Sequence, residues 1–345
     1  MKLRLVVVCL VVFFLSGVTV AQVRSVLLLD RDWKFKNSEV EQGAKPSFDD
    51  SAWEKVRVPH DWAILGDFDM NLDTQMVQVV EDGEKVPRLR TGRTGALPMF
   101  GVGWYRKVLP MTTADRDKRV FIEFDGAMSL AKVYLNGKFV GEWPYGYASF
   151  SFDLTSFIQF DKPNVLAVRL ENRPESSRWY AGAGIFRNVR LVKTATSYIP
   201  QWGTFITTPK VTAKIAEINI RTELVSVDGK PSQIKLVTDI FTQSGTKVAS
   251  VSSKQTVQEK ALFTQKATIK NPAMWSLETP HLYTAISKVY VDNVLKDEYR
   301  STFGCRTLRF DKDKGFFLND KHVKLQGVCM RSEEHTSELQ SHHDL

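Results

Sequence analysis

The sequence predicts an all-β chain in which two β-sandwiches follow one another. Short runs of alternating apolar and polar residues recur along it, as at residues 131–135, 164–170 and 261–269, and such alternation is typical of half-buried strands. The first of these runs leads into Asn136-Gly137, the strongest short signal for a β-hairpin. In the first half of the chain, no run of helical period competes with these strands. Many short strands at regular spacing favour a sandwich or a jelly roll.

The length and composition are those of an ordinary globular protein. The chain has 345 residues, which corresponds to about two domains at roughly 150 residues each. Its net charge is +8, or +6 without Lys2 and Arg4. The basic residues are scattered and form no run with interleaved aromatic residues. We therefore expect no nucleic-acid partner.

Residues 1–21 have the pattern of a secretory signal peptide. Lys2 and Arg4 precede an apolar run at residues 5–15, and Thr19-Val20-Ala21 is a small-residue cleavage pattern. The alternative is a retained membrane anchor, but the run is shorter than the ~20 apolar residues that span a membrane. We expect export to the periplasm or to the outside, with no stable membrane span after cleavage.

The first sandwich is expected over residues 22–197. A long segment at residues 60–100, rich in Gly, Asp and Arg, interrupts its strand pattern, and loops of such length are usually functional or disordered. The runs with strand character are residues 32–35, 56–59, 104–109, 120–124, 131–135, 138–141, 150–154, 164–170 and 189–192.

A second sandwich, of the immunoglobulin type, is expected over residues 198–304. It lacks the paired cysteines of antibody domains and must depend on packing, and we interpret Trp275 and Tyr283 as packing aromatics. Cys305 and Cys329 are interpreted as buried thiols rather than a metal site, while a single disulfide stays open in an oxidising compartment. The runs with strand character are residues 218–227, 234–242, 247–253, 261–269 and 282–291.

The most distinctive stretch is the long loop between the last two expected strands of the first sandwich. Gly182 and Gly184 permit backbone angles that other residues avoid, so the loop can fold tightly. Trp179 and Tyr180 offer flat apolar faces that suit a sugar ring, and Arg178 offers donors to hydroxyl or carboxylate oxygens. The alternative is that both aromatics plug the end of a sandwich, since aromatics usually pack.

Five pieces of the chain, taken in order, carry a family resemblance. They are Val58-Pro59-His60-Asp61-Trp62, Gly103-Trp104-Tyr105-Arg106, Val133-Tyr134-Leu135-Asn136-Gly137-Lys138, Ser177-Arg178-Trp179-Tyr180 with Gly184-Ile185-Phe186-Arg187, and Gly315-Phe316-Phe317-Leu318-Asn319. Together they resemble glycoside hydrolase family 2, the family of β-galactosidases, β-glucuronidases and β-mannosidases. The resemblance implies a jelly-roll sugar-binding domain, an immunoglobulin-like sandwich and then a catalytic (β/α)8 barrel.

The resemblance places the start of the barrel domain at residues 305–330. We expect a hairpin with an Asn-Asp turn at Asn319 and Asp320, and then an apolar strand at residues 322–330, which begins the barrel in the family. A barrel needs at least ~200 further residues. We therefore expect the chain to be an N-terminal fragment.

The tail at residues 331–345 is expected to be artefactual or truncated. Residues 331–341 resemble a translated sequencing adapter, and family members run from Gly-Val-Cys-Met directly into His-His-Asp-Leu. Removing the adapter-like residues restores that continuity at His342-His343-Asp344-Leu345. The alternative is a genuine charged helix. Clustered His and Asp can bind zinc, but we assign no metal role to this tail.

The two catalytic carboxyl groups of the family are glutamates on late barrel strands. Retaining glycosidases hold such a pair about 5–5.5 Å apart. Those strands are absent from this sequence, so we assign no catalytic residue, and we expect no metal and no cofactor. Pairs such as Asp49-Asp50 and Glu333-Glu334 are expected to be solvated.

Substrate positioning is what the resemblance leaves to this chain, with Asp61, Arg178, Trp179 and Tyr180 as the predicted substrate-binding residues. Asp61 matches an Asn or Asp that contacts sugar hydroxyls in the family, although its residue type equally suits a turn carboxylate. His60 is expected to be structural. Arg178 departs from the related β-galactosidases, which place a carboxylate there, so the sugar stays open.

The function expected from these observations is an exported, retaining, β-galactosidase-like glycosidase with a carbohydrate substrate. This chain alone is expected to be inactive, and the full-length enzyme can be an oligomer. β-Glucuronidase and β-mannosidase are the alternatives within the family. A stand-alone carbohydrate-binding or adhesion protein is the alternative outside it, but the apolar strand near the end speaks against it, since exposed apolar edges invite aggregation.

Overall fold

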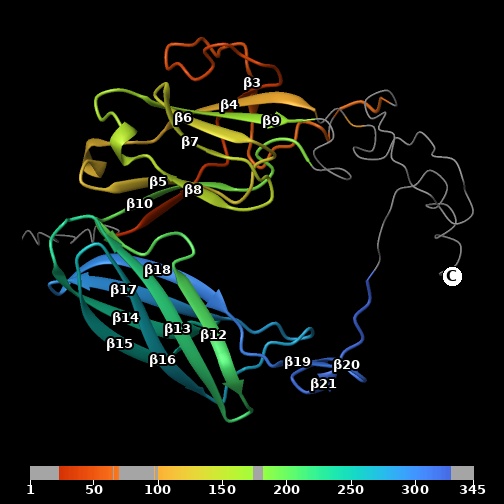
Figure 1. The fold of residues 1–345 in the computed structure, drawn as a ribbon, viewed down its shortest axis with the longest axis vertical. Helices are drawn as coiled ribbons and strands as arrows, with labels where there is room; N and C mark the ends of the chain where they lie inside the picture. Colours follow the sequence, from red (N-terminus) through yellow and green to blue (C-terminus); the bar gives the residue numbers. More distant parts are fainter. Residues whose placement is uncertain (1–22, 65, 70–96, 98–99, 174–181, 328–345) are drawn as a thin grey trace, which may run out of the picture.

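The computed structural model describes residues 23–64, 66–69, 97, 100–173 and 182–327. These residues form two antiparallel sandwiches, one above the other in Figure 1, and a small three-stranded sheet beside the second. The only helices in the described ranges are two 3₁₀ turns, η1 (Thr113–Asp115) and η2 (Thr155–Phe157). The predicted all-β class is confirmed.

Two opposed sheets build the first sandwich. One has the order β1-β10-β5-β8, and the other has the order β3-β2-β4-β9-β6-β7. Neighbouring strands are often distant in sequence, as in a jelly roll. The strands are β1 (Ser25–Leu28), β2 (Trp33–Lys36), β3 (Glu54–Val56), β4 (Gly101–Leu109), β5 (Arg119–Phe124), β6 (Ala131–Leu135), β7 (Lys138–Trp143), β8 (Phe150–Asp153), β9 (Asn164–Asn172) and β10 (Val189–Thr194).

The core of this sandwich follows from the period of two along each strand. In β5, for example, Val120, Ile122 and Phe124 are buried while the residues between them are partly exposed. They pack with Trp33 and Tyr105 from the opposite sheet in one continuous hydrophobic cluster. Burial of such large side chains stabilises the fold by about 1.5–3 kcal/mol each.

The hairpin between β6 and β7 turns as its sequence predicts. Asn136 and Gly137 have φ angles of 54° and 79°, and two successive positive φ angles are typical of a type I′ turn. Leu135 pairs with Lys138 across this turn.

Two further sheets build the second sandwich. In one, β13 pairs with β11, β12 and β16, and the other has the order β15-β14-β17-β18. The five expected strands are confirmed as β13 to β17, whereas β11, β12 and β18 were not predicted from the sequence. The strands are β11 (Ser197–Tyr198), β12 (Thr204–Val211), β13 (Ile215–Ser226), β14 (Ser232–Thr242), β15 (Lys247–Val257), β16 (Lys260–Lys270), β17 (Tyr283–Val291) and β18 (Val294–Phe303).

Several packing residues of the second sandwich agree with expectation. Tyr283 is buried, and its hydroxyl accepts a hydrogen bond of 2.7 Å from the backbone N–H of Ala273. Trp275 is partly buried beneath the guanidinium group of Arg306, which lies 4.6 Å from the ring centroid. Cys305 is a buried free thiol.

One expected solvated charge is instead a structural ion pair. Asp50 binds the Nε atom of Arg106 at 2.7 Å, and the Arg106 side chain is almost fully buried. A buried guanidinium requires such a partner because an unpaired charge in the interior is strongly destabilising. The prediction for Asp50 was therefore wrong.

A small sheet of three strands, β19 (Leu308–Asp311), β20 (Gly315–Leu318) and β21 (Lys321–His322), follows the second sandwich. Asn319 and Asp320 have φ angles of 51° and 62°, which confirms the expected turn. The expected apolar strand at residues 322–330 is not confirmed: residues 323–327 form no strand. The backbone N–H of Val323 still donates to the carbonyl oxygen of Phe316 on β20 at 2.9 Å, but the strand pairing does not continue through residues 324–327.

Several expectations lie outside the described residues. They concern the signal peptide, most of the segment at residues 60–100, Cys329 and the tail from residue 331. Among the residues that are described, no helix is long and apolar enough to cross a membrane.

Candidate functional site

Three segments meet at one end of the first sandwich. The backbone N–H of His60 donates to Ile185 at 2.8 Å, and that of Trp62 donates to Ala183 at 2.9 Å. Met128 and Gly184 exchange two backbone hydrogen bonds, of 2.9 and 3.0 Å. The segment that contains the Pro-His-Asp-Trp motif therefore lies against the distal half of the long loop.

Gly182 and Gly184 give this contact its shape. Their φ angles are +78° and +121°, in the region that favours glycine. A Cβ atom on Gly184 would lie 2.4 Å from the hydroxyl of Tyr105 and 2.6 Å from the carbonyl oxygen of His60. The expectation that these glycines allow a tight loop is confirmed.

Asp61 fixes the two segments to each other. Its Oδ1 atom accepts hydrogen bonds from the backbone N–H groups of Ala63 at 2.9 Å and Ala183 at 3.1 Å. The first of these is the local turn that a short carboxylate favours, and the second crosses to the loop. The expected turn role of Asp61 is therefore observed, while its contact with a sugar stays a prediction.

The ends of the loop are joined by an amide. The Nδ2 atom of Asn172, at the end of β9, donates to the carbonyl oxygen of Gly182 at 3.0 Å. Ser129 supports the end of β9 through a hydrogen bond of 2.9 Å to the carbonyl oxygen of Glu171. The loop thus leaves and rejoins the sandwich next to Asp61.

Beneath this end, the partly buried His60 contacts the fully buried Tyr105. The Nδ1 atom of His60 lies 2.7 Å from the hydroxyl of Tyr105, and the ring of Phe35 packs against the imidazole at 4.7 Å. Burial lowers the pKa of His60 and raises the pKa of Tyr105 well above its usual value. Both shifts favour the neutral forms of the two groups, and the contacts with Tyr105 and Phe35 agree with the structural role expected of His60.

Of the predicted substrate-binding residues, only Asp61 lies in the described part of the chain. Arg178, Trp179 and Tyr180 lie outside it, within the segment between Asn172 and Gly182. The sequence analysis missed Tyr105, Ser129 and Asn172 as supports of this end. A polar Asn at the close of an apolar strand, directly before the loop, is a signal that could have indicated the last of them. In the described ranges, no group of three or more His, Cys, Asp or Glu residues is arranged to hold a metal ion.

Comparison with known families accounts for both sandwiches. The description "Glycosyl hydrolases family 2, sugar binding domain" matches residues 27–195, and "Glycosyl hydrolases family 2" matches residues 198–306. The chain belongs to glycosyl hydrolase family 2. The end of the family 2 jelly roll that carries Asp61 is therefore part of a sugar-binding domain.

Individual family 2 proteins agree with this assignment. The chain is 39% identical to a β-galactosidase of Bacteroides ovatus over 91% of its own length, and 30% identical to a β-glucuronidase of Formosa agariphila over 86%. A solved family 2 structure from Bacteroides cellulosilyticus superposes with a TM-score of 0.80 at 30% identity and covers 88% of the chain.

The chain spans about a third of the length of these family 2 relatives. It covers 34% of the Bacteroides ovatus protein, 31% of the Formosa agariphila protein and 38% of the solved structure. This coverage agrees with the expectation of an N-terminal fragment.

Proposed function

We propose that this chain is the sugar-positioning part of an exported family 2 glycosidase that hydrolyses β-galactosides with retention of configuration. The observation that carries the proposal is the 39% identity to a β-galactosidase, which extends over 91% of the chain. The two catalytic glutamates belong to the barrel that follows in the family, so the chain alone is inactive.

Asp61 is proposed to contact the sugar hydroxyls. Its Oδ1 atom is already engaged by two backbone N–H groups, so the local turn holds the carboxylate in a fixed orientation. A carboxylate accepts hydrogen bonds through two oxygens, which suits the hydroxyl groups of a sugar. Arg178, Trp179 and Tyr180 are proposed to complete the contact, because they belong to the loop that Asp61 and Asn172 hold at its base.

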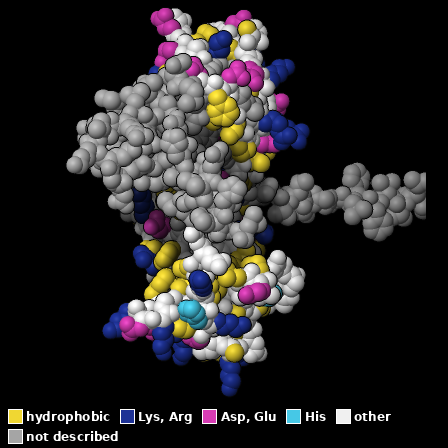
Figure 2. All heavy atoms as spheres, turned by 90° about the vertical axis from the view of Figure 1, so that its right-hand side faces the viewer, with side chains coloured by type: hydrophobic (Ala, Val, Ile, Leu, Met, Phe, Trp, Pro, Cys, Tyr) yellow, Lys and Arg dark blue, Asp and Glu magenta, His cyan; other side chains and the backbone are white. Residues whose placement is uncertain are grey.

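The small sheet is proposed to lie against the barrel. Figure 2 shows hydrophobic side chains gathered on the lower part of the face that carries this sheet. Leu308 and Phe310 on β19 and Leu325 beyond β21 are all exposed. Apolar side chains gathered on one face are typical of a surface that another domain or subunit covers.

Export is proposed from the signal peptide at residues 1–21, which directs the mature enzyme to the periplasm or to the outside.

A β-glucuronidase activity is the second candidate. It is favoured by the similarity to the Formosa agariphila β-glucuronidase and by Arg178, whose guanidinium group is suited to bind a sugar carboxylate.

The test uses the gene extended through the barrel, with codons 331–341 removed. The extended enzyme is assayed on nitrophenyl galactoside, glucuronide and mannoside beside the chain as printed. We expect turnover of the galactoside by the extended enzyme alone. Preference for the glucuronide supports the second candidate, and turnover by the printed chain contradicts the missing catalytic pair.

The role of Asp61 is tested in the same enzyme by Asp61→Asn. The amide oxygen can keep both backbone hydrogen bonds while the charge is lost. Loss of a charged hydrogen bond of about 1.5–3 kcal/mol lowers kcat/KM roughly 10- to 100-fold. The matched control is Asp49→Asn, another turn carboxylate that accepts from a backbone N–H two residues on. Unchanged kinetics in both variants contradict the proposed contact.

A further inference from the structure

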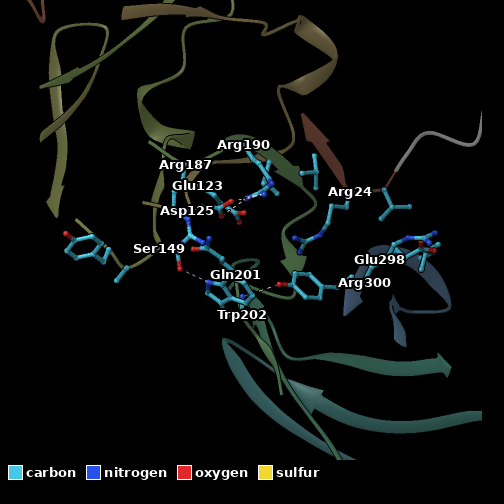
Figure 3. A pocket seen from close by; sticks show the side chains of 17 residues that line it. Arg24, Glu123, Asp125, Ser149, Arg187, Arg190, Gln201, Trp202, Glu298 and Arg300 are labelled. Atoms are coloured by element: carbon cyan, nitrogen blue, oxygen red, sulfur yellow. Dashed lines mark hydrogen bonds and ion pairs between the residues drawn. The ribbon is translucent and has the colours of Figure 1, made fainter. Parts of the chain in front are cut away.

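A large cleft separates the two sandwiches (Figure 3). Its volume is about 1180 Å³, and its walls come from β5 and β10 of the first sandwich and from β18 and the segment before β12 of the second. Arg187, three residues after Gly184, lines it, but neither Asp61 nor the loop glycines do. The cleft is therefore distinct from the sugar-binding end of the jelly roll.

Trp202 is held in this cleft in an unfavourable backbone conformation. Its side chain is 71% exposed and its φ angle is +58°, a region that bulky residues rarely adopt. It occupies a turn closed by a hydrogen bond of 2.9 Å from Gly203 to Pro200. Such outliers persist where the surroundings fix them, and they cluster at functional sites.

Both sandwiches hold Trp202, one through its backbone and the other through its indole. Its backbone N–H donates to the hydroxyl of Tyr299 at 3.1 Å, and its Nε1 atom donates to the hydroxyl of Ser149 at 2.9 Å. Figure 3 shows the indole nitrogen directed at Ser149. The ring edge is thus engaged, while most of the side chain surface stays open to solvent. This arrangement makes the indole a rigid aromatic platform.

The charges of the cleft divide into paired and unpaired groups. Arg190 binds Asp125 through two hydrogen bonds of 2.7 and 2.9 Å, and Arg300 binds Glu298. Within the described residues, Glu123 and Arg187 have no hydrogen-bonding or ion-pair partner. Burial raises the pKa of Glu123 despite the nearby arginines. Among the described residues of the cleft, a carboxylate and a guanidinium group thus lack such a partner, and the lining carries little net charge.

These features match the chemistry of a neutral sugar. A pyranose ring has an apolar face that packs on an aromatic ring, and its hydroxyls both donate and accept, which suits Glu123, Arg187 and the amide of Gln201. Tyr147, also on the wall, adds a second exposed aromatic ring. Pockets for drug-sized ligands measure ~300–1,000 Å³. The volume therefore suits an oligosaccharide better than a single sugar.

We propose that the cleft between the sandwiches is a second, non-catalytic carbohydrate site, which binds a neutral oligosaccharide against Trp202. Glu123 and Arg187 bind its hydroxyls, and Trp202 stacks on one ring. The proposal does not rest on the proposed glycosidase activity, because a cleft without catalytic groups can bind a glycan whatever reaction the complete protein catalyses.

The test is isothermal titration of the chain with β-1,4-galactotetraose and cellotetraose as neutral probes and with tri-galacturonate as an acidic probe. We expect at least one neutral tetrasaccharide to bind more tightly than tri-galacturonate. No binding of any probe overturns the proposal, and so does a preference for the acidic probe.

Variants locate the binding site. Trp202→Ala and Glu123→Gln should each weaken binding at least tenfold, while Trp202→Phe, which keeps a ring, should weaken it less than Trp202→Ala. The control is Phe205→Ala, another exposed aromatic residue, which does not line the cleft. Thermal unfolding checks that each variant is folded. If Trp202→Ala does not fold, the binding affinities of Trp202→Phe and Glu123→Gln test the proposal instead.

The Asp61→Asn variant distinguishes binding in the cleft from binding at the end of the jelly roll. Binding that persists in Asp61→Asn but is lost in the cleft variants supports the second site. Binding that is lost in Asp61→Asn and unchanged in the cleft variants places the sugar at the jelly-roll end and overturns the inference.

Discussion

Arg24 and Asp297 join the two sandwiches through a bidentate ion pair. The Nε and Nη2 atoms of Arg24 donate to Oδ1 and Oδ2 of Asp297, each at 2.8 Å. The Asp297 side chain is fully buried and that of Arg24 is 9% exposed. Asp297 also accepts from the backbone N–H of Ile199 at 2.8 Å, and the guanidinium of Arg24 stacks on Tyr299 at 4.8 Å. The pair thus fixes the junction of the sandwiches.

Substitution of Arg24 by Ala is expected to be strongly destabilising. It leaves the Asp297 carboxylate buried without its cation, a change that costs about 3–5 kcal/mol. Urea unfolding followed by circular dichroism measures the loss. The control is Arg300→Ala, which breaks the more exposed pair with Glu298 and should cost only about 0–1 kcal/mol. Equal losses in the two variants would contradict a structural role for the buried pair.

The same pair explains why β18 escaped the sequence analysis. Asp297 occupies the most buried position of this strand, so a charge stands where the alternating pattern requires an apolar residue. The remaining sequence signal for this strand was the Asp292-Asn293 turn before it, where both residues have positive φ angles. β12 was missed for another reason: it contains Pro209 and an irregular register between Thr207 and Lys210, as edge strands tolerate.

The sequence predicted local features better than contacts between distant segments. The strands of alternating pattern and the Asn136-Gly137 turn depend on neighbouring residues, and both were predicted correctly. The contact of His60 with Tyr105 depends on how β4 pairs with distant strands, which a pattern of period two leaves open. The Trp202 platform was not predicted either, because a left-handed turn is expected at Gly or Asn rather than Trp.

Substitution of Gly184 by Ala should disrupt the sugar-binding end. The new Cβ would meet the Tyr105 hydroxyl at 2.4 Å, at a φ angle of +121°, and overpacking of this kind costs about 1–3 kcal/mol in addition to the backbone strain. Gly245→Ala is the matched control, since Gly245 also has a positive φ but no atom within 4 Å of the added carbon. Gly245→Ala should lower the free energy of unfolding only through backbone strain at the positive φ, by about 1–2 kcal/mol. Thermal unfolding of both variants tests the difference, and equal shifts would refute the steric argument.

His60 should make the chain less stable in mild acid. The unfolded chain binds a proton on this imidazole near pH 6.5, whereas burial lowers the pKa in the folded chain despite Glu54 and Asp61 nearby. The contribution of His60 to the free energy of unfolding is therefore complete above about pH 6.5. It declines as the pH falls toward the folded pKa and is constant below it.

His60→Gln should remove this part of the pH dependence. Urea unfolding between pH 7.5 and pH 5 measures it, in a range above the titration of most carboxylates. His281→Gln is the control, because His281 is exposed. A slope that persists unchanged in His60→Gln would show that another group is responsible.

The thiol of Cys305 should be inert in the folded chain. It is buried, and burial raises its pKa to about 11, so the reactive thiolate is scarce at pH 8. A chain that starts at residue 22 and carries Cys329→Ser leaves this thiol alone. Ellman's reagent at pH 8 should label it only after unfolding in urea, whereas an added Ser244→Cys, at an exposed turn position, should react at once. Labelling of folded Cys305 would mean that the region around the small sheet opens in solution.

The exposed apolar residues of the small sheet should promote self-association of the isolated chain. Phe310 is 76% exposed, and its ring is tilted by 40° against that of Phe316, with the centroids 5.0 Å apart. Leu308 on the same strand is also exposed. Uncovered apolar patches of this kind favour aggregation. Light scattering against concentration should show less association for Leu308→Ser with Phe310→Ser than for the unaltered chain. Val108→Ser, at an exposed site on the first sandwich, should have no such effect, and an equal improvement there would mean that general surface hydrophobicity, rather than this sheet, drives association.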